Sequence, residues 1–367
     1  MPGSRRVLAV VIWFVALMSI GWAPSSRIWR AAGVLLDLGA ASQDSSALVE
    51  RELSIPGRNG PIRARLYRLT DRARHPGLVV SHGVHYQGID ERRLVPFARS
   101  LARAGLVVVT PQLDDLADYR ISARGIDTIK DSASWLVSRD ELLEGSRVGL
   151  LGFSFAGGLS LVAASEPELA GRVAYVTSVG GHHDLSRVLR FLVSDELETP
   201  QGIEHGQAHE YGLVVLVYSH LDRFVPEADR VKLGGALRAW LREDRPTALA
   251  LAAERTTPEG ERLFDRLVSG RLKELRPELE RLIMEDSGEL ARLSPRGRLR
   301  RIGVPVYLLH GAADNVIPPS ETRWAELELE GSEHEALVSP LLEHVELGHA
   351  AAVFERVSLV RFMAHML

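Results

Sequence analysis

The sequence predicts an α/β protein with a mostly parallel sheet that helices cover on both faces. The first observation is a series of short, continuous apolar runs, which are typical of strands buried on both faces. The second is that helical patterns separate these runs, as in repeated strand–helix–strand units. The third is that residues able to take part in catalysis, such as serine, aspartate and histidine, directly follow several of the runs. The runs lie at residues 77–83, 105–111, 147–154, 172–181 and 304–311.

Composition narrows the class of protein. The chain has 367 residues, of which 46% are hydrophobic and 25% charged, so it can build a sizeable core. Its net charge of −4, with no basic excess, argues against nucleic-acid binding. The sequence contains no cysteine, which excludes disulfides, cysteine-based metal sites and cysteine nucleophiles.

The N-terminus predicts targeting. Arg5 and Arg6 precede the apolar stretch 7–22, which is long for a signal-peptide core and slightly short for a membrane span. We therefore expect residues 1–30 to be an uncleaved signal anchor or a cleaved signal peptide, with a buried helix as the remaining alternative. The protein is then exported or membrane-anchored, in a bacterial-type cell envelope. Its orientation stays open because Arg27 and Arg30 flank the other end of the stretch.

The first part of the core is expected at residues 47–185. It begins with two strands at 48–55 and 62–69, which the turn signal between them joins as a hairpin. Four buried strands follow, at 77–83, 105–111, 147–154 and 172–181. They alternate with helices over 94–102, 126–137 and 157–164.

The strand–helix alternation stops near Asp184 and resumes at 304. The intervening segment, 186–300, is mostly helical in pattern, including a stripe formed by Leu272, Leu275, Leu279, Leu282 and Ile283. We expect a cap over an active site, because insertions at the loop end of such sheets overhang that edge. The alternative is a packing insertion without a role in chemistry. The second part of the core, 301–367, then contains strands at 304–311 and 344–347, and helices at 320–329 and 350–366.

Ser154 is the candidate nucleophile. It lies in the segment Gly-Phe-Ser-Phe-Ala, after an apolar strand and before a small-residue helix. A nucleophile elbow requires this context, because strand and helix collide unless the positions two residues on either side are small. Gly152 and Ala156 meet that requirement. The N-terminus of the following helix also favours developing negative charge.

Asp314 is the candidate acid. It follows the apolar strand at 304–311, so it lies at the carboxyl edge of the sheet, where such folds place their sites. A carboxylate there can orient a histidine and stabilise its cation. The alternative is that Asp314 caps the next helix.

His349 is the candidate base, since it follows the last expected strand beside a glycine and can exchange protons near neutral pH. His344 and His334 are rivals. The loop at residues 81–85 is expected to supply one oxyanion N–H from Val84, and the residue after the nucleophile, Phe155, the other. His82 is expected to be structural, and His85 and Tyr86 to line the pocket.

The order Ser154, Asp314, His349, each after its own strand, resembles the α/β-hydrolase family. The resemblance covers roughly residues 49–184 and 302–367, in an esterase-like, dienelactone-hydrolase-like or serine-aminopeptidase-like branch with a helical cap. It implies an eight-stranded, mostly parallel sheet, a Ser154–His349–Asp314 triad and no cofactor. Ala156 replaces the usual second glycine of the elbow, a sterically mild change. Because the acid follows an earlier strand in some relatives, Asp184 is the alternative to Asp314.

The histidines at 182–183, and at 205 and 209, imitate metal-ligand spacing, but without the glutamate arrangement of a zinc protease, so we expect no metal.

The function that we predict is hydrolysis of a small carboxylic ester, with an amide as the second choice. Two alternatives stay open. An acyltransferase would use the same triad, and a membrane-tethered binding protein would keep the fold without catalysis. Substrate identity and oligomeric state are not predicted.

Overall fold

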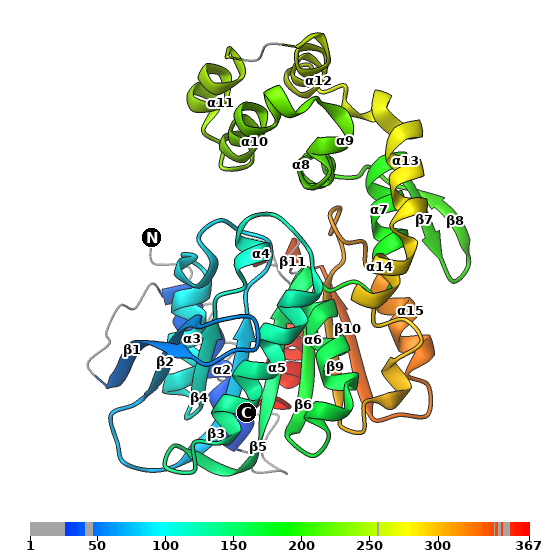
Figure 1. Ribbon diagram of the computed structural model, residues 1–367. Helices are drawn as coiled ribbons and strands as arrows, with labels where there is room; N and C mark the ends of the chain where they lie inside the picture. Colours follow the sequence, from blue (N-terminus) through cyan, green and yellow to red (C-terminus); the bar gives the residue numbers. More distant parts are fainter. Residues whose placement is uncertain (1–25, 41–46, 255–256, 341, 344–345, 348–352) are drawn as a thin grey trace, which may run out of the picture.

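An eight-stranded sheet with the order β1-β2-β4-β3-β5-β6-β9-β10 forms the centre of the molecule (Figure 1). β1 and β2 form an antiparallel hairpin, and β2 pairs antiparallel with β4. All the remaining pairings in this sheet are parallel, so the prediction of a mostly parallel, eight-stranded sheet is confirmed. The strands are β1 (Leu48–Ile55), β2 (Ile62–Leu69), β3 (His75–Ser81), β4 (Val107–Pro111), β5 (Leu143–Phe153), β6 (Val173–Val179), β9 (Val306–Gly311) and β10 (His334–Ser339).

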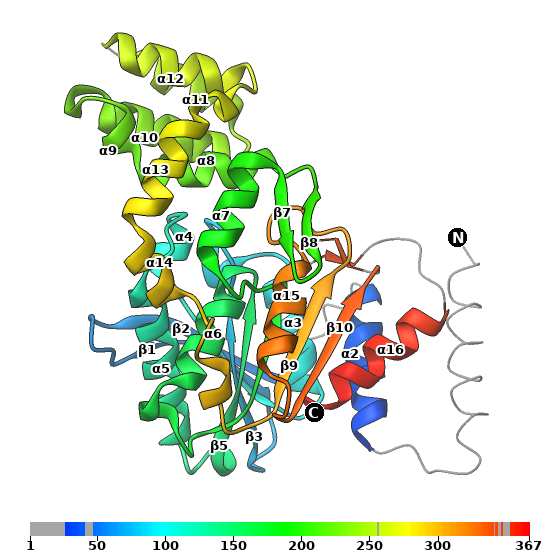
Figure 2. The same cartoon turned by 90° about the vertical axis from the view of Figure 1, so that its right-hand side faces the viewer.

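The computed structural model describes residues 26–40, 47–254, 257–340, 342–343, 346–347 and 353–367. Helices cover both faces of the sheet, because alternate side chains of each buried strand point to opposite faces. Val79 packs in the cluster that contains residues of α5 (Ala123–Val137), α6 (Phe155–Ser165) and α15 (Ser320–Glu328). Its neighbours Leu78 and Val80 pack on the other face, with α2 (Ser26–Ala40), α3 (Leu94–Arg103) and α16 (Val353–Ala364). Figure 2 shows α2 and α16 side by side.

Helix α2 was not predicted. Its first five residues fall within the range 1–30 that we assigned to an N-terminal signal, but Ala31 and Val34 are buried in the core. The packing partners of α2 include α16, more than 300 residues later in the chain, so no local pattern marks this helix as part of the fold.

The insertion between β6 and β9 stands on the side of the sheet where β4 leads into the short helix α4 (Asp114–Ala117) (Figure 1). It contains a two-stranded hairpin as well as helices, and the hairpin was not predicted. Its elements are α7 (Leu185–Ser194), β7 (Glu196–Thr199), β8 (Gly202–His205), α8 (Glu210–Ser219), α9 (Leu221–Phe224), α10 (Glu227–Leu241), α11 (Arg245–Ala252), α12 (Pro258–Val268), α13 (Arg276–Glu285) and α14 (Ser287–Leu293).

The last strand of the main sheet is β10. In the range 344–347, where we expected the last strand, the described residues 346–347 do form a strand, β12 (Glu346–Leu347), but it pairs with β11 (Leu342–Glu343) outside the main sheet. β10 was missed because it is an edge strand. Five of its six residues are only partly buried, so the sequence there carries charged residues and no continuous apolar run.

Within the described residues, no helix combines the length and apolar character that a membrane span requires. The stretch 7–22, on which we base the prediction of an anchor, lies outside that part of the chain.

Candidate active site

Ser154 lies at the junction of β5 and α6 in a strained backbone conformation. Its φ of 55° and ψ of −132° are in a region that residues other than glycine rarely adopt, at a cost of about 1–3 kcal/mol. The Ser154 N–H donates to the Val179 carbonyl over 2.7 Å, and the Gly157 N–H donates to the Ser154 carbonyl over 2.8 Å. The neighbouring backbone thus holds the sharp strand-to-helix turn on which a nucleophile elbow depends.

The small residues beside the turn are sterically necessary. A Cβ atom at Gly152 would lie 2.2 Å from the carbonyl oxygen of Ala156, and one at Gly157 would lie 2.5 Å from the Ser178 hydroxyl. β5 and α6 therefore approach too closely for a side chain at position 152. Ala156 is fully buried, and its methyl group is accommodated where the resemblance implies a glycine.

The loop after β3 contacts the elbow at Gly83. A Cβ atom there would lie 3.0 Å from the Cβ of Ser154, so the main chain of this loop passes directly against the serine. The next residue is Val84, whose N–H the sequence predicts as one donor of the oxyanion hole. Phe155 is the first residue of α6, and the N–H groups of a first helical turn point out of the helix end. Both positions suit donors aimed at an oxyanion formed on Ser154.

His82 fixes the conformation of this loop. It is buried, its Nδ1 is 2.7 Å from the Gly83 carbonyl, and its Nε2 accepts the Leu113 N–H over 3.0 Å. Nδ1 therefore carries the proton of a neutral ring. His82 joins the loops that follow β3 and β4. Burial lowers the pKa of His82 from 6.5 to about 4.

This buried histidine makes stability depend on pH. The unfolded chain binds the His82 proton near pH 6.5, whereas the folded chain binds it near pH 4. The contribution of His82 is therefore complete above pH 6.5 and is lost as the pH falls towards 4. We expect the free energy of unfolding in guanidinium to drop by about 2 kcal/mol through His82 between pH 7 and pH 5. The variant His82→Gln should show a correspondingly smaller drop, and an equal drop in both proteins would contradict this assignment.

The loop also contacts the insertion, which sequence reasoning missed. Tyr211, in the first turn of α8, donates its hydroxyl hydrogen to the Val84 carbonyl over 3.3 Å. In addition, the His209 N–H donates to the Asn315 carbonyl over 2.9 Å, in the loop that carries Asp314. Helix α8 thus overlies two of the loops that form the candidate site. No sequence signal distinguishes Tyr211 from an ordinary packing tyrosine.

Asp314 is buried in the loop after β9. Its Oδ1 accepts the N–H groups of Val316 and Ile317 over 2.9 and 3.0 Å. These bonds close its own loop, and α15 begins later, at Ser320, so the alternative that Asp314 caps this helix is wrong. The ring of His310 is fully buried behind this loop, with its Nε2 2.8 Å from the Ile317 carbonyl.

Asp184, the alternative acid, is engaged elsewhere. One oxygen accepts the N–H groups of Ser186 and Arg187 as the N-cap of α7, and the other pairs with Arg296 at 2.7 Å. Burial opposes its ionisation, but the hydrogen bond from Arg296 and the charge of Arg187 keep the pKa of Asp184 below its ordinary value. Both oxygens are committed to the base of the insertion, which favours Asp314 as the acid.

The predicted base, His349, lies outside the described residues. His334, one of its rivals, begins β10, and the other, His344, also lies outside the described residues. Of the pocket residues that we expected, His85 and Tyr86 have their rings 4.8 Å apart, and Tyr86 is partly exposed.

In the part of the chain that the structure describes, no three histidine or acidic side chains gather as a metal site would require. The suspected histidines contact protein groups instead. His182 Nε2 is 3.0 Å from the Leu293 carbonyl, His183 Nε2 is 2.7 Å from Glu328, and His209 accepts the Tyr211 N–H.

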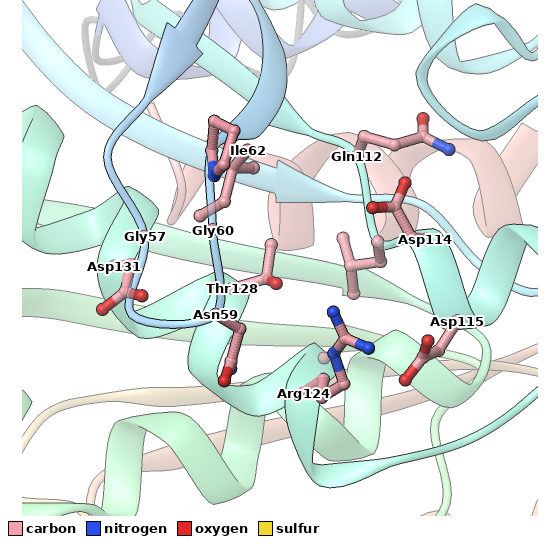
Figure 3. Close-up of a pocket in the computed structure, with 13 residues that line it drawn as sticks. Gly57, Asn59, Gly60, Ile62, Gln112, Asp114, Asp115, Arg124, Thr128 and Asp131 are labelled. Carbon is pink, nitrogen blue, oxygen red and sulfur yellow. The ribbon is translucent and has the colours of Figure 1, made fainter.

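Two cavities lie away from Ser154. One, of about 40 Å³, lies between the β1–β2 turn, the loop after β4 and α5 (Figure 3), and holds a few waters at most. The other is an open depression of about 460 Å³ on the surface where the base of the insertion meets α15, and it is lined by His183, Arg296, Gly297, Arg300, Trp324, Leu327 and Glu328. Neither includes a predicted catalytic residue.

Comparisons with known proteins give relatives in structure alone. No protein-family model and no curated protein matches the sequence. The acylaminoacyl peptidase of Pyrococcus horikoshii is similar over 89% of this chain and 43% of its own, with a TM-score of 0.51 and 12% identity. An acylaminoacyl peptidase bound to a chloromethyl ketone matches over 86% of this chain and 40% of its own, with a TM-score of 0.51 and 13% identity. An esterase of Pyrobaculum calidifontis matches over 100% of this chain and 97% of its own, with a TM-score of 0.48 and 17% identity.

The order and direction of the strands, the turn at Ser154 between β5 and α6, and the similarity to the acylaminoacyl peptidases agree with one another. The chain has the α/β-hydrolase fold.

Proposed function

We propose that the protein is a serine hydrolase that cleaves a carboxylic ester, with an amide as the second choice. The observation that carries this proposal is the strained, buried Ser154 at the strand-to-helix junction, with the Gly83 loop packed against it. Strain of this kind persists only where the surrounding structure enforces it, and it is common at reacting groups. The structural relatives include acylaminoacyl peptidases, which is consistent with acyl chemistry.

In the proposed mechanism, Ser154 attacks the acyl carbon while His349 takes its proton. Asp314 holds His349 in the required tautomer and stabilises the imidazolium. The backbone N–H groups of Val84 and Phe155 bind the oxyanion. Loss of one such donor typically raises the activation free energy by about 3 kcal/mol. His349 then protonates the leaving group, and water releases the acyl group from Ser154.

Labelling with a fluorophosphonate tests this proposal, because such probes react with activated serines. We expect one modified peptide, carrying Ser154, and loss of the label in His349→Ala. The variant Ser160→Ala is a matched control, since Ser160 lies on the same helix and its buried hydroxyl has no partner among the described residues. A folded protein that takes no label on Ser154 would contradict the proposal and favour a binding protein. Labelled protein that transfers acyl groups to an added alcohol, but not to water, would indicate an acyltransferase.

We also propose that residues 186–300 act as a cap. Contacts of α8 with the Val84 and Asp314 loops support the cap.

We further propose that residues 7–22 export the protein or tether it to a membrane. The tether is tested by alkaline extraction of membranes that carry the full chain or a chain without residues 1–25, a deletion that leaves α2 intact. Equal release of both proteins would exclude a tether.

A further inference from the structure

The boundary between the insertion and the core runs beside the Val84 loop. Besides the bond from Tyr211 to Val84, the Tyr218 hydroxyl lies 3.0 Å from the Asp118 carboxylate, and Arg238 of α10 donates to the same carboxylate over 2.6 Å. The Ser219 hydroxyl, which donates to the Val215 carbonyl of its own helix over 2.9 Å, also lies 3.3 Å from the Tyr119 carbonyl. Helices α8 and α10 therefore pack on the loops that follow β3 and β4. We call this boundary the cap–core seam.

Tyr119 is held in the cap–core seam with an unused hydrogen-bond donor. Its φ of 59° is unfavourable for a residue with a side chain, and its side chain is 1% exposed. The ring contacts the rings of Tyr211 and Tyr218 edge-on, each at 6.3 Å. Among the described residues the buried Tyr119 hydroxyl has no hydrogen-bond acceptor, and the polar side chain that interacts with it is Arg242, which has only donors. Burial raises the pKa of Tyr119 to about 12, so the hydroxyl keeps its proton at neutral pH.

Arg242 supplies a positive charge at the same place. It follows the last residue of α10, and its guanidinium lies 5.1 Å from the centre of the Tyr86 ring. Its charge acts on Tyr119, where it partly opposes the effect of burial on the pKa. No carboxylate pairs with Arg242 in the described part of the chain, whereas Arg238, one turn earlier, pairs with Asp118.

A buried donor without an acceptor and a cation without an anion are complementary to a carboxylate, which accepts several hydrogen bonds and pairs with guanidinium groups. An unmatched buried hydroxyl costs about as much as a lost hydrogen bond, so a ligand that supplied the acceptor would gain affinity. We propose that Arg242 and the Tyr119 hydroxyl bind a carboxylate at the far end of the substrate. This inference rests on the proposed hydrolysis at Ser154.

The chain length between Gly83 and Tyr86 limits how far the proposed carboxylate site can lie from Ser154. Gly83 touches Ser154, and Tyr86, under Arg242, is three residues farther along the chain, so roughly 10 Å of chain at most separates them. The half-ester of a dicarboxylic acid can place its ester at Ser154 and its free carboxylate at Arg242. A simple alkanoate ester of the same length lacks the second group.

The experiment compares p-nitrophenyl half-esters of dicarboxylic acids of four to ten carbons with p-nitrophenyl alkanoates of matched length. For at least one chain length we expect Arg242→Gln to lower the ratio of kcat/KM for charged over neutral ester about tenfold, the effect of roughly 1.4 kcal/mol. Tyr119→Phe should lower the same ratio. Arg245→Gln is the matched control, because Arg245 stacks on Trp240 at 3.6 Å and contacts none of the residues assigned to the carboxylate site. It should leave the ratio unchanged.

Failure of this inference and failure of the proposed function give different results. If the protein hydrolyses neutral esters but Arg242→Gln changes the ratio at no chain length, the carboxylate site is wrong and the hydrolase stands. If no ester is hydrolysed, calorimetry of suberate binding to the Ser154→Ala protein decides. Binding that weakens about tenfold on adding Arg242→Gln supports the site. Equal binding, or none, overturns it.

Discussion

Replacing Ser154 with alanine is expected to lower kcat for ester hydrolysis by at least about 10⁴-fold. Removing the nucleophile of a serine triad has effects of this size, since only oxyanion binding and substrate positioning remain. The free energy of unfolding should change by less than about 1 kcal/mol, because only one hydroxyl is removed and alanine meets the same backbone strain at φ 55°. Rates with p-nitrophenyl esters and guanidinium unfolding curves measure the two effects.

Ser160→Ala separates loss of the nucleophile from disturbance of α6. Ser160 is fully buried on α6, and we expect this variant to keep ester hydrolysis within a few-fold of the original rate. If the Ser154→Ala protein retained hydrolysis above one-tenth, a different residue would have to be the nucleophile, and the proposed mechanism would be wrong.

The sheet and the elbow could be predicted because their signals are local. A strand buried on both faces needs an unbroken apolar run, and the turn at Ser154 needs a small residue at 152 because β5 and α6 almost touch there. The residue types therefore reveal the packing before the structure is known. Asp314 could be placed at the carboxyl edge for the same reason, since it follows such a run within three residues.

Other parts of the fold depend on distant partners. α2 packs with α16, and β10 is a partly exposed edge strand, so neither has a pattern that a local window detects. Tyr119 is unremarkable in sequence. Its strained backbone and its unmatched hydroxyl appear only when α8 is placed over it. The structure moreover leaves the expected roles of His349 and of the stretch 7–22 as predictions, because both lie outside the described residues.

The second large expected effect concerns the base of the insertion. Glu321 of α15 is fully buried, and its carboxylate accepts four donors from the start of the insertion. The His183 and Asp184 N–H groups each lie 2.8 Å from Oε2, while Arg187 donates Nε to Oε1 over 2.6 Å and Nη2 to Oε2 over 3.2 Å. Arg187 also donates to Nδ1 of His183 and stacks on Trp324.

We expect Glu321→Gln to lower the free energy of unfolding by about 3–5 kcal/mol, measured in urea or guanidinium. Removing one partner of a buried ion pair leaves the other charge uncompensated, which has this cost. The glutamine amide would also turn an N–H₂ group towards one of the existing donors. Glu326→Gln is the matched control, because Glu326 lies on the same helix but is exposed, and its change should stay within about 0.5 kcal/mol.

The double variant Arg187→Met, Glu321→Leu distinguishes the ion pair from the other hydrogen bonds that the Glu321 carboxylate accepts. Replacing both charges with apolar side chains leaves no uncompensated charge. The double variant should therefore lose less free energy of unfolding than the sum of the losses in Arg187→Met and Glu321→Leu. Recovery should remain incomplete, because the N–H groups of His183 and Asp184 would still lack their acceptor. Strict additivity would mean that Arg187 and Glu321 do not act as a pair. A change below 1 kcal/mol for Glu321→Gln would mean that this network does not hold the insertion to the core.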